Sequence, residues 1–356
     1  MKVFEVIMAG GGGTRFWPLS RKERPKQLLN ISGKDIMLNE TIRRMDGIVE
    51  REDVYIVTNE SQQKLMRDMI INGVPFRNIL TEPAARNTSP CVLYAASVLM
   101  KLHGDGIMCV FPADHHVANI PEYQRTLRKA IQAAEVSDKI VTIGITPTYP
   151  ATGYGYISRT KKEELEEVYQ VRKFVEKPNL NVATKYLAEG TYLWNSGVFV
   201  WKISTILKAF KRHLPAMYDQ MQEIVEALGT PSEKEVLERV YPQLESISVD
   251  YGILEREADV LVLEGDYGWS DVGSLDALNT FHREDSDGNI LLGDVLAINS
   301  HNSIVKGHDK LIAMVGMENT IVVETEDALL ICNKDKAQNV KKVVDELAAR
   351  HRTELL

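Results

Sequence analysis

A run of four glycines near the amino terminus constrains this chain more than any other stretch. It occupies positions 10–13 and follows a short apolar segment, residues 3–8, that is expected to form a β-strand. Residues without a Cβ let backbone N–H groups approach a ligand closely, and such amides bind phosphate oxygens. Arg15 follows at once, and Lys26 stands after a second turn. The stretch predicts a polyphosphate loop at the end of a first strand; the alternative is a plain flexible turn.

Two common phosphate-binding loops are excluded by the residues that follow the glycines. A Walker A loop requires Gly-Lys and then Ser or Thr, whereas Gly13 precedes Thr14 and Arg15. The dinucleotide-binding motif requires a glycine three positions after Gly12, where Arg15 stands. The loop therefore belongs to neither class.

The composition of the chain argues against some classes of binding partner. The chain has 356 residues, of which 44% are apolar and 26% charged, with a net charge of −8 and no block of lysines and arginines. This balance argues against a nucleic-acid surface, and no segment reaches the roughly 20 apolar residues that span a bilayer. Three cysteines lie far apart, without metal-ligand spacing, and are expected to be free thiols. With no signal peptide at the amino terminus, we expect a soluble cytoplasmic protein that binds neither nucleic acid nor membrane.

Short apolar runs alternate with helical patterns up to about residue 145. Strands are expected at 54–58, 78–80, 107–111 and 139–145, and helices at 61–71, 89–102 and 121–136. This alternation predicts a Rossmann-like α/β fold, a mostly parallel sheet flanked by helices, whose ligands bind at the carboxyl ends of the strands. The pattern is more mixed from 150 to 285, with strands expected at 154–159, 168–175, 193–201 and 260–263 and helices at 181–187 and 274–281. A long helical region is expected between the strand at 193–201 and about residue 239.

The pattern of expected secondary structure changes after a polar cluster at residues 285–289. Short strands are expected at 290–298, 303–305, 311–315, 320–324 and 328–332, which predicts a small β module of solenoid or β-helix type. Residues 335–352 show helical spacing of apolar residues and are expected to dock on the β module or on a partner subunit. We therefore expect an α/β domain over 1–286, which the family resemblance described below makes the catalytic domain, and a β-rich carboxyl-terminal domain over 287–356.

Two aspartates follow expected strands and are candidates for a metal site. Asp114 ends the most apolar strand, and Asp271 lies in Trp-Ser-Asp-Val-Gly-Ser, after the strand at 260–263. Mg²⁺ uses one or two carboxylates and completes its shell with phosphate and water. Taken alone, an aspartate such as Asp114 is more often a turn or cap residue, and the alternative for Asp271 is an N-cap. His115 and His116 point opposite ways in an extended chain and are expected to be structural.

Other segments offer groups that recognise a sugar phosphate or a base. Glu176 and Lys177 end a strand, where the lysine suits a monophosphate and the glutamate suits hydroxyls; the alternative is an exposed charge pair. Asn195 offers an amide, and Tyr154 with Gly155 allows close backbone approach. The segment 82–88, which includes Glu82, Asn87 and Thr88, follows a strand and is a candidate for reading a base edge.

Taken in order, these motifs resemble the sugar-phosphate nucleotidylyltransferases, and most closely the mannose-1-phosphate guanylyltransferases. The match runs from Val6 to about Phe281 and includes Gly-Gly-x-Gly-Thr-Arg-x-x-Pro-Leu-Ser, Pro-Ala-Asp-His, Val-Glu-Lys-Pro, Trp-Asn-Ser-Gly and Trp-Ser-Asp-Val-Gly-Ser. The β module and tail resemble that family's small carboxyl-terminal domain. Phe16 stands where the family usually has Leu, and Leu275 where Trp is common, which puts local packing rather than chemistry in question.

The resemblance implies transfer of GMP from GTP to mannose 1-phosphate, giving GDP-mannose and pyrophosphate. Arg15, Lys26, Asp114, Lys177 and Asp271 are the implied catalytic residues, with Mg²⁺ on Asp114 and Asp271. The implied sugar-phosphate residues are Tyr154, Gly155, Glu176, Lys177 and Asn195. The implied nucleotide-binding residues are Met8, Ala9, Gly10, Gly11, Gly12, Gly13, Thr14, Glu82, Asn87 and Thr88, without a choice among the last three for the base.

Three alternatives remain open from the sequence. The first keeps the chemistry but uses another nucleotide or sugar 1-phosphate. The second is a non-catalytic homologue that regulates a partner, although such a protein is expected to have lost one of the charged residues retained here. A glycosyltransferase of related fold is disfavoured because no Asp-x-Asp motif follows the strands. The apolar faces of the tail and β module predict a homodimer.

Overall fold

The computed structural model describes all residues, 1–356, and the chain divides into two compact units. The sheet unit comprises Met1–Gly10, Ile42–Ala113 and Val117–Trp269. The loop unit comprises Gly11–Thr41, Asp114–His116 and Ser270–Leu356. The glycine loop and the β module therefore belong to one unit, although they lie at opposite ends of the sequence. The domain boundary expected at residue 286 stays a prediction.

A nine-stranded sheet forms the centre of the sheet unit, in the order β3-β2-β1-β4-β9-β6-β10-β8-β7. Its strands are β1 (Val3–Met8), β2 (Val54–Asn59), β3 (Ile79–Glu82), β4 (Ile107–Pro112), β6 (Ile140–Ile145), β7 (Tyr156–Leu165), β8 (Val168–Val175), β9 (Tyr192–Lys202) and β10 (Val260–Gly265). Two further strands are short, β5 (His116–Val117) and β11 (Trp269–Ser270). Neighbours β1, β2, β3 and β4 pair in parallel, as do β6 and β10, whereas β9 and β8 run antiparallel to their neighbours. The expected mostly parallel sheet is confirmed.

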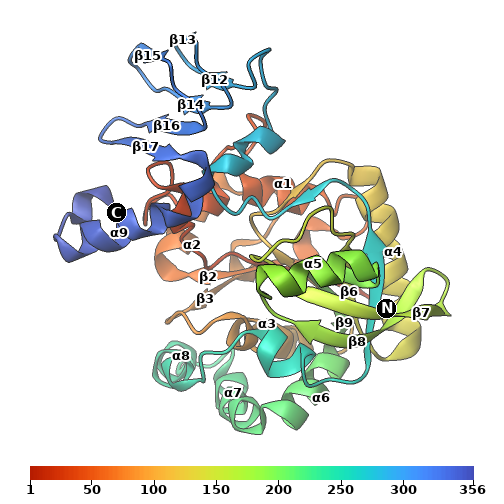
Figure 1. Cartoon of the computed structure of the whole chain (residues 1–356). Coiled ribbons are helices and arrows are strands. Elements are labelled where there is room, and N and C mark those ends of the chain that lie inside the picture. The colour runs from red at the N-terminus through yellow and green to blue at the C-terminus, as the bar shows by residue number, and fades with distance from the viewer. The chain divides into compact units, whose positions relative to one another are not determined.

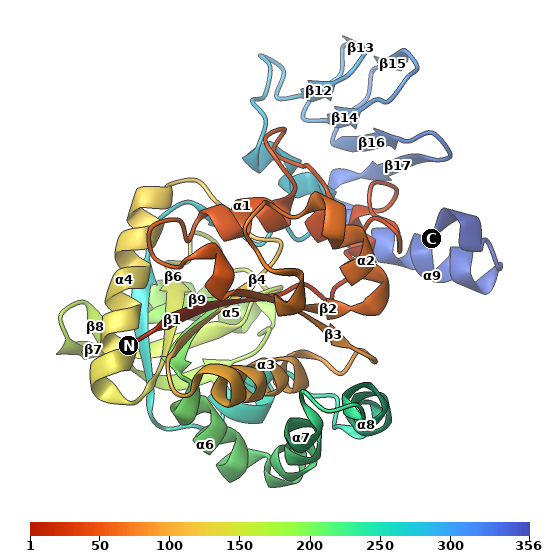
Figure 2. The same ribbon diagram turned by 180° about the vertical axis from the view of Figure 1, so that it is seen from behind.

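Helices cover both faces of this sheet (Figures 1 and 2). The α-helices of the chain are α1 (Met37–Arg43), α2 (Glu60–Met69), α3 (Thr88–His103), α4 (Ile120–Ser137), α5 (Leu180–Glu189), α6 (Ile203–His213), α7 (Pro215–Ala227), α8 (Glu233–Val240) and α9 (Val340–Ala349). Phe4 and Val6 of β1 pack in the core that includes α3, α6 and α7. On the opposite face, α4 places Tyr123 against Phe111, with ring centroids 6.4 Å apart. A sheet buried on both faces explains the nearly continuous apolar runs of β1 and β4.

The register of the two central strands positions the loops that follow them. Met8 of β1 pairs with Pro112 of β4, and the amide of Ala113 donates to the carbonyl of Met8 at 3.1 Å. Both strands therefore end at the same edge of the sheet. The glycine run and Asp114, each expected after a strand, therefore follow strands that end side by side.

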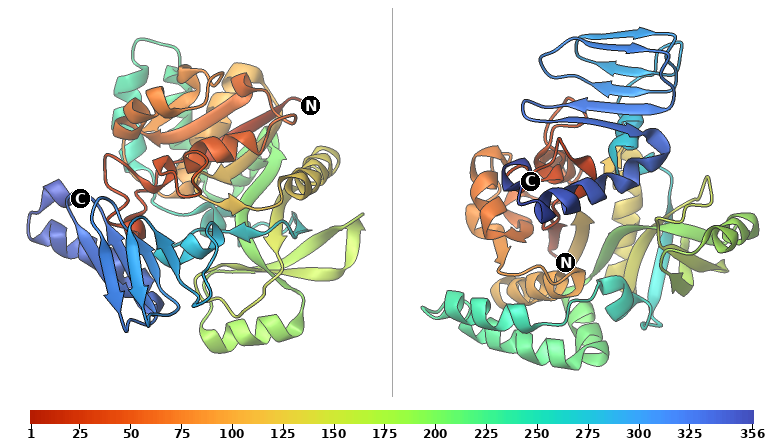
Figure 3. Two further views of the ribbon diagram at one scale, coloured as in Figure 1. Left: turned by 90° about the horizontal axis from the view of Figure 1, so that it is seen from above. Right: turned by 60° about the vertical axis from the view of Figure 1, so that its left-hand side comes forward.

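The carboxyl-terminal part of the loop unit is a β-helix-like module (Figure 3). Its strands are β12 (Ile290–Leu292), β13 (Val295–Ile298), β14 (Ile304–Lys306), β15 (Ile312–Val315), β16 (Thr320–Glu324) and β17 (Leu329–Asn333). They form one sheet of order β12-β14-β16-β17 and a second of β13 and β15. Ile290, Ile304 and Ile321 pair in register, and all are buried. Stacking equivalent apolar residues from successive turns is the principle of a solenoid core, so the predicted module is confirmed.

The terminal helix α9 docks within its own unit. A 3-10 segment, η8 (Lys334–Asn339), leads into it. Val340, Val343, Val344 and Leu347 of α9 belong to the same core as Phe16 and Trp17 of the glycine loop. The indole Nε1 of Trp17 donates to the carbonyl of Leu355 at 2.8 Å. This core also buries Leu275 completely, so both apolar departures from the family pattern, Phe16 and Leu275, are accommodated in packed positions.

The structure differs from the predicted elements in several places. The long helical region expected up to about residue 239 is divided into α6, α7 and α8. The helix expected at 274–281 is a 3-10 segment, η7 (Leu275–Thr280). The single strand expected at 290–298 is interrupted after Leu292 and forms both β12 and β13, because a β-helix turns its chain between short strands. Helix α1 was not predicted. None of the helices has both the length and the apolar character needed to cross a bilayer.

Candidate active site

The glycine loop has a shape that depends on Gly13. This residue has φ = 64° and precedes a short 3-10 turn, η1 (Thr14–Phe16). A Cβ at position 13 would lie 2.3 Å from Cβ of Lys26. Both the left-handed backbone and this contact require glycine. By contrast, a Cβ on Gly11 or Gly12 would meet no atom within 4 Å, so these two residues leave open space beside their amides.

Side chains of the following segment hold the loop in place. Gln27 Nε2 donates to the carbonyl of Gly11 at 3.0 Å, and Ser20 Oγ donates to the carbonyl of Gly13 at 2.7 Å. These bonds occupy the carbonyl oxygens. An amide-rich loop whose carbonyl groups are bonded elsewhere is suited to an anionic ligand.

Lys26 connects the loop to the two candidate metal residues. It lies in η2 (Lys26–Leu28), and its side chain is only 5% exposed. Its Nζ donates to Asp114 Oδ2 at 2.8 Å and to the backbone oxygen of Asp271 at 3.0 Å. Desolvation alone would raise the pKa of Asp114, but the charges of Lys26 and His115 and the Lys26 hydrogen bond hold that pKa below its usual value. Asp114 is therefore a carboxylate at neutral pH.

These groups line one cavity of about 350 Å³, which we call the loop cavity. All of its lining residues belong to the loop unit: Gly13, Thr14, Arg15, Phe16, Lys26, Asp114, His115, Asp271, Gly273 and Lys341. Arg15, Lys26, Asp114 and Asp271, four of the five predicted catalytic residues, thus come together. His115 also lines it, although it was expected to be only structural.

The segment after Asp271 is shaped to present its carboxylate. A Cβ on Gly273 would lie 2.7 Å from Asp271 Oδ2, so a larger residue there would displace the carboxylate. Val272 has φ = 47°, a strained conformation for a β-branched residue. Such strain concentrates at functional sites. Two carboxylates facing one cavity beside an anion-binding loop provide the hard oxygen ligands that suit a divalent cation such as Mg²⁺.

A second cluster lies within the sheet unit and contains the residues predicted for the sugar phosphate. Glu176 lies close to Gly155, because a Cβ on Gly155 would be 2.5 Å from Glu176 Oε2. The backbone N–H of Asn195 donates to the carbonyl of Gly155 at 2.8 Å. Lys177 extends to solvent and pairs with Glu176 Oε1 at 2.7 Å. Tyr154 packs edge-on against Trp194 and forms an aromatic wall. The structure therefore brings together all five predicted sugar-phosphate residues.

Asp250 joins this cluster and was missed in the sequence. It begins a π-helical turn, η6 (Asp250–Leu254), and accepts from Asn195 Nδ2 at 2.7 Å. Burial and the nearby Glu176 charge raise the pKa of Asp250 to about 6, against the effect of the Asn195 hydrogen bond. No local motif marks this aspartate, because its partners come from distant strands.

The three candidate base-reading side chains of the segment 82–88 have different partners. Asn87 Oδ1 accepts from the amide of Thr88 at 2.9 Å, and Thr88 Oγ1 accepts from the amide of Val249 at 2.8 Å. Both side chains therefore bond to nearby backbone. Glu82 instead receives a hydrogen bond from the hydroxyl of Tyr241, and its other oxygen would lie 3.2 Å from a Cβ on Gly10.

Burial raises the pKa of Glu82 to about 7, even though the hydrogen bond from Tyr241 lowers it. Tyr241, fully buried, was also missed in the sequence. A half-ionised carboxyl group at the end of β3, facing the residue that begins the glycine run, is a feature expected of a functional site rather than of a packed core.

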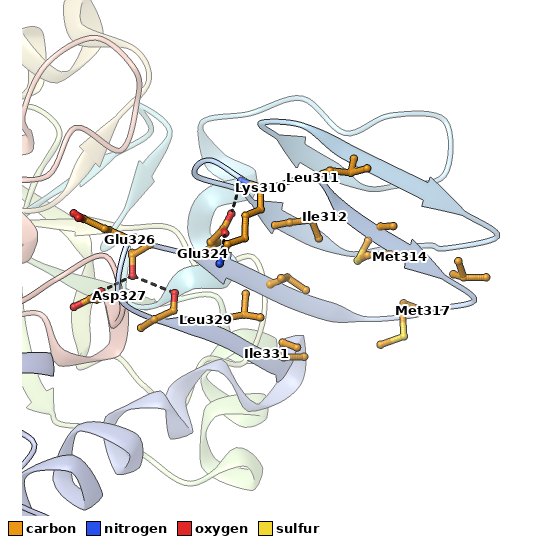
Figure 4. Close-up of a pocket in the computed structure, with 15 residues that line it drawn as sticks. Lys310, Leu311, Ile312, Met314, Met317, Glu324, Glu326, Asp327, Leu329 and Ile331 are labelled. Atoms are coloured by element: carbon orange, nitrogen blue, oxygen red, sulfur yellow. Dashed lines mark hydrogen bonds and ion pairs between the residues drawn. The ribbon is translucent and has the colours of Figure 1, made fainter.

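The β module carries a separate, apolar groove (Figure 4). It measures about 580 Å³, and Met314 and Val322 are its buried apolar lining residues. Leu311, Val315, Leu329 and Ile331 line it and are more than half exposed. The charged side chains Lys310, Glu324, Glu326 and Asp327 gather at one end of it.

The fold and the loop cavity define a nucleotide-transferring protein, and comparison with known families agrees. The nucleotidyl transferase family model matches residues 4–288, and a model of the MannoseP isomerase/GMP-like beta-helix domain matches 293–347. The chain belongs to the nucleotidyl transferase family and carries that β-helix domain.

Its relatives include mannose-1-phosphate guanylyltransferases. The chain is 38% identical to the enzyme of Escherichia coli strain K12 over an alignment of 362 positions, gaps included. This alignment covers 99% of this chain and 75% of that protein. It is 36% identical to the alginate biosynthesis protein AlgA of Pseudomonas aeruginosa over 354 residues, 98% of this chain and 73% of AlgA. A crystal structure described as mannose-1-phosphate geranyltransferase from Thermus thermophilus superimposes with a TM-score of 0.88 at 32% identity, covering 98% of this chain and all of that one.

Proposed function

We propose that this protein transfers GMP from GTP to α-D-mannose 1-phosphate, giving GDP-mannose and pyrophosphate. The observation that carries the proposal is the loop cavity, where an amide-rich loop, cationic side chains and two carboxylates converge. Relatives that span nearly the whole chain bear the name of this activity. The experiment that tests it is the release of pyrophosphate from GTP and mannose 1-phosphate by the purified chain.

The chemistry needs positioning and charge neutralisation rather than a strong base. A phosphate oxygen of the sugar forms a bond to the α-phosphorus of GTP, and the bond to the bridging oxygen breaks as pyrophosphate leaves with the electron pair. A phosphate monoester is already a nucleophile, so no covalent enzyme intermediate is required. Catalysis then comes from holding the reactants in line and stabilising the charge on the leaving group.

The residues of the loop cavity suit the triphosphate. We assign the amides of Gly11–Gly13 and the guanidinium of Arg15 to β- and γ-phosphate oxygens, and Thr14 lines the same cavity. Met8, Ala9 and Gly10, which belong to the sheet unit, are assigned to the nucleotide from the family resemblance alone. Lys26, buried and fixed by Asp114, supplies a positive charge beside the α-phosphate. Asp114 and Asp271 are the residues that would hold Mg²⁺, which would neutralise charge on phosphate oxygens.

The cluster in the sheet unit suits the sugar phosphate. Lys177 is 62% exposed on its side chain and can swing toward a monophosphate. Glu176 accepts hydrogen bonds from sugar hydroxyls, and the side-chain amide of Asn195 donates to them. Gly155 permits close approach of the sugar, and a side chain there would displace Glu176. We add Asp250 to this group, since it fixes the amide of Asn195.

Glu82 is the group that we assign to guanine. An ionised carboxylate accepts from both the N1–H and the exocyclic amino group of guanine, and adenine lacks this pair of donors. A buried acceptor left unpaired by the wrong base discriminates strongly against it. Asn87 and Thr88 position the segment through the backbone bonds described above.

We also propose that the protein acts as a homodimer in the cytoplasm, on small molecules rather than on nucleic acid or membrane. The exposed apolar groove of the β module supports the dimer, because apolar patches of this kind mark interaction surfaces. Light scattering of the wild type and of Ile331→Glu tests it. A dimeric wild type and a monomeric variant are expected; a monomeric wild type would contradict the dimer.

A further inference from the structure

The loop cavity contains a lysine from the far end of the chain. Lys341 is the second residue of α9, and it lines the cavity together with Gly13, Arg15 and Lys26. It is 326 positions away from Arg15 in the sequence. No motif of the family resemblance includes it, and no local pattern separates it from its neighbour, Lys342.

The placement of Lys341 is built into the core of the loop unit. Val340, directly before it, is 2% exposed and packs in the core that contains Phe16 and Trp17. Val343, Val344 and Leu347 continue the same apolar face, and Trp17 Nε1 bonds to the carbonyl of Leu355 beyond the helix. The helix is thus fixed against the turn that carries Arg15 at both ends. Lys341 lies about 100° around the helix from Val340, at the edge of this anchored apolar face, and there it lines the cavity, whereas Lys342 lies about a further 100° around the helix.

The charges in the cavity are unevenly matched. The cavity is lined by three cationic side chains, Arg15, Lys26 and Lys341, and by the carboxylates of Asp114 and Asp271. Lys26 is paired with Asp114, whereas the side chains of Arg15 and Lys341 make no hydrogen bond or ion pair. Other lysines of the chain, such as Lys139, Lys202 and Lys334, do find partners. Two unpaired cations beside open amides leave room for an anion with several negative oxygens.

We propose that Lys341 is a phosphate-binding residue, which contacts the β- and γ-phosphates of the nucleotide together with Arg15. The carboxyl-terminal helix then contributes directly to the nucleotide site, beyond its role in packing. This inference rests on the proposed function only in taking a triphosphate as the ligand. A contact to phosphate does not depend on the base, so it is separate from the assignment of guanine.

The test compares two neighbouring lysines. Lys341→Ala is expected to raise the KM for GTP, and the KM for pyrophosphate in the reverse reaction, by about tenfold or more, since a hydrogen bond to a charged group is lost. Lys342→Ala removes the same charge from the same helix, but Lys342 does not line the cavity; its KM values are expected to match the wild type. Lys341→Arg keeps the charge and is expected to recover most of the affinity.

A base-independent probe separates this inference from the proposed reaction. Calorimetric binding of inorganic tripolyphosphate is expected to weaken by a similar factor in Lys341→Ala and to stay unchanged in Lys342→Ala. The two proposals can fail separately. If the wild type does not turn over GTP and mannose 1-phosphate but Lys341→Ala still weakens its binding of tripolyphosphate, the proposed function is refuted and the role of Lys341 stands. Values within twofold of wild type for Lys341→Ala, or equal losses in both variants, would overturn the inference. An unchanged unfolding midpoint for each variant confirms that the helix remains docked.

Discussion

Lys26 and Asp114 form an ion pair of 2.8 Å within the loop cavity, and the same ammonium group bonds to the backbone oxygen of Asp271 at 3.0 Å. One buried cation therefore fixes both candidate metal residues, although 245 positions separate Lys26 from Asp271. Because Lys26 occupies a single oxygen of Asp114 and only the backbone of Asp271, it positions these residues without occupying every carboxylate oxygen.

The metal assignment predicts the behaviour of two conservative variants. Asp114→Asn and Asp271→Asn keep the side-chain volume but weaken a hard oxygen ligand, so each is expected to lower turnover by at least about 100-fold and to raise the Mg²⁺ requirement. Pyrophosphate release as a function of Mg²⁺ concentration measures this. Asp266→Asn, an exposed aspartate on the sheet unit, serves as the control. Near-normal turnover in either variant would show that the substituted aspartate is not a metal ligand.

The conformation of Gly13 predicts unequal effects of two adjacent substitutions. Gly13→Ala places a Cβ at positive φ and against Lys26, and is expected to cost about 1–3 kcal/mol of the free energy of unfolding and to abolish tripolyphosphate binding. Gly12→Ala meets open space at an ordinary φ, so its unfolding midpoint is expected to stay near wild type. Chemical denaturation measures both, and equal losses would refute the role of Gly13.

Glu82 predicts a pH dependence of nucleotide binding. With a pKa of about 7, the carboxylate that accepts from guanine disappears as the pH falls through 7. GTP affinity is expected to weaken about fivefold from pH 7 to pH 6 through this group alone. Glu82→Gln should bind GTP weakly and lack that component, which separates it from the titration of GTP itself. Tyr241→Phe removes the hydrogen bond that stabilises the carboxylate, so the midpoint should move upward. Identical pH profiles for the wild type and Glu82→Gln would exclude Glu82 as the base reader.

Lys177 predicts an effect confined to one substrate. Lys177→Ala removes the only cation that we assign to the sugar phosphate, and its KM for mannose 1-phosphate is expected to rise about tenfold or more while GTP affinity stays unchanged. Lys173→Ala, on β8 of the same region, is the matched control. Steady-state kinetics with each substrate varied in turn separates the two effects. A change in GTP affinity alone would show that the role given to Lys177 is incorrect.

Much of the fold and the loop chemistry could be predicted from sequence because the signals are local. The first fifteen residues contain Val3–Met8, the four glycines and Arg15. In the sheet unit, the spacing of apolar residues within each segment distinguishes strands from helices. Asp114 was recognisable because it follows a strand buried on both faces. The short strands of the β module recur at regular spacing and indicated a solenoid for the same reason.

The missed residues act through contacts that the sequence does not display. Asp250 is paired with Asn195 across 55 positions, and Tyr241 with Glu82 across 159. Lys341 differs from Lys342 only in the direction that a docked helix gives it. Helix α1 is short, with seven residues, and its weak periodicity falls below what a local pattern can identify. In each instance the deciding information is tertiary.

The central claim is that this chain joins GMP to mannose 1-phosphate. The most direct test measures pyrophosphate release by the purified chain with the common nucleoside triphosphates against several sugar 1-phosphates, with Mg²⁺ present and with it chelated. We expect GTP with mannose 1-phosphate and Mg²⁺ to give the highest kcat/KM, by at least about tenfold over any other pair, because the buried carboxylate of Glu82 penalises bases without matching donors. Faster release from UTP or dTTP with glucose 1-phosphate, or no release from any pair, would contradict it.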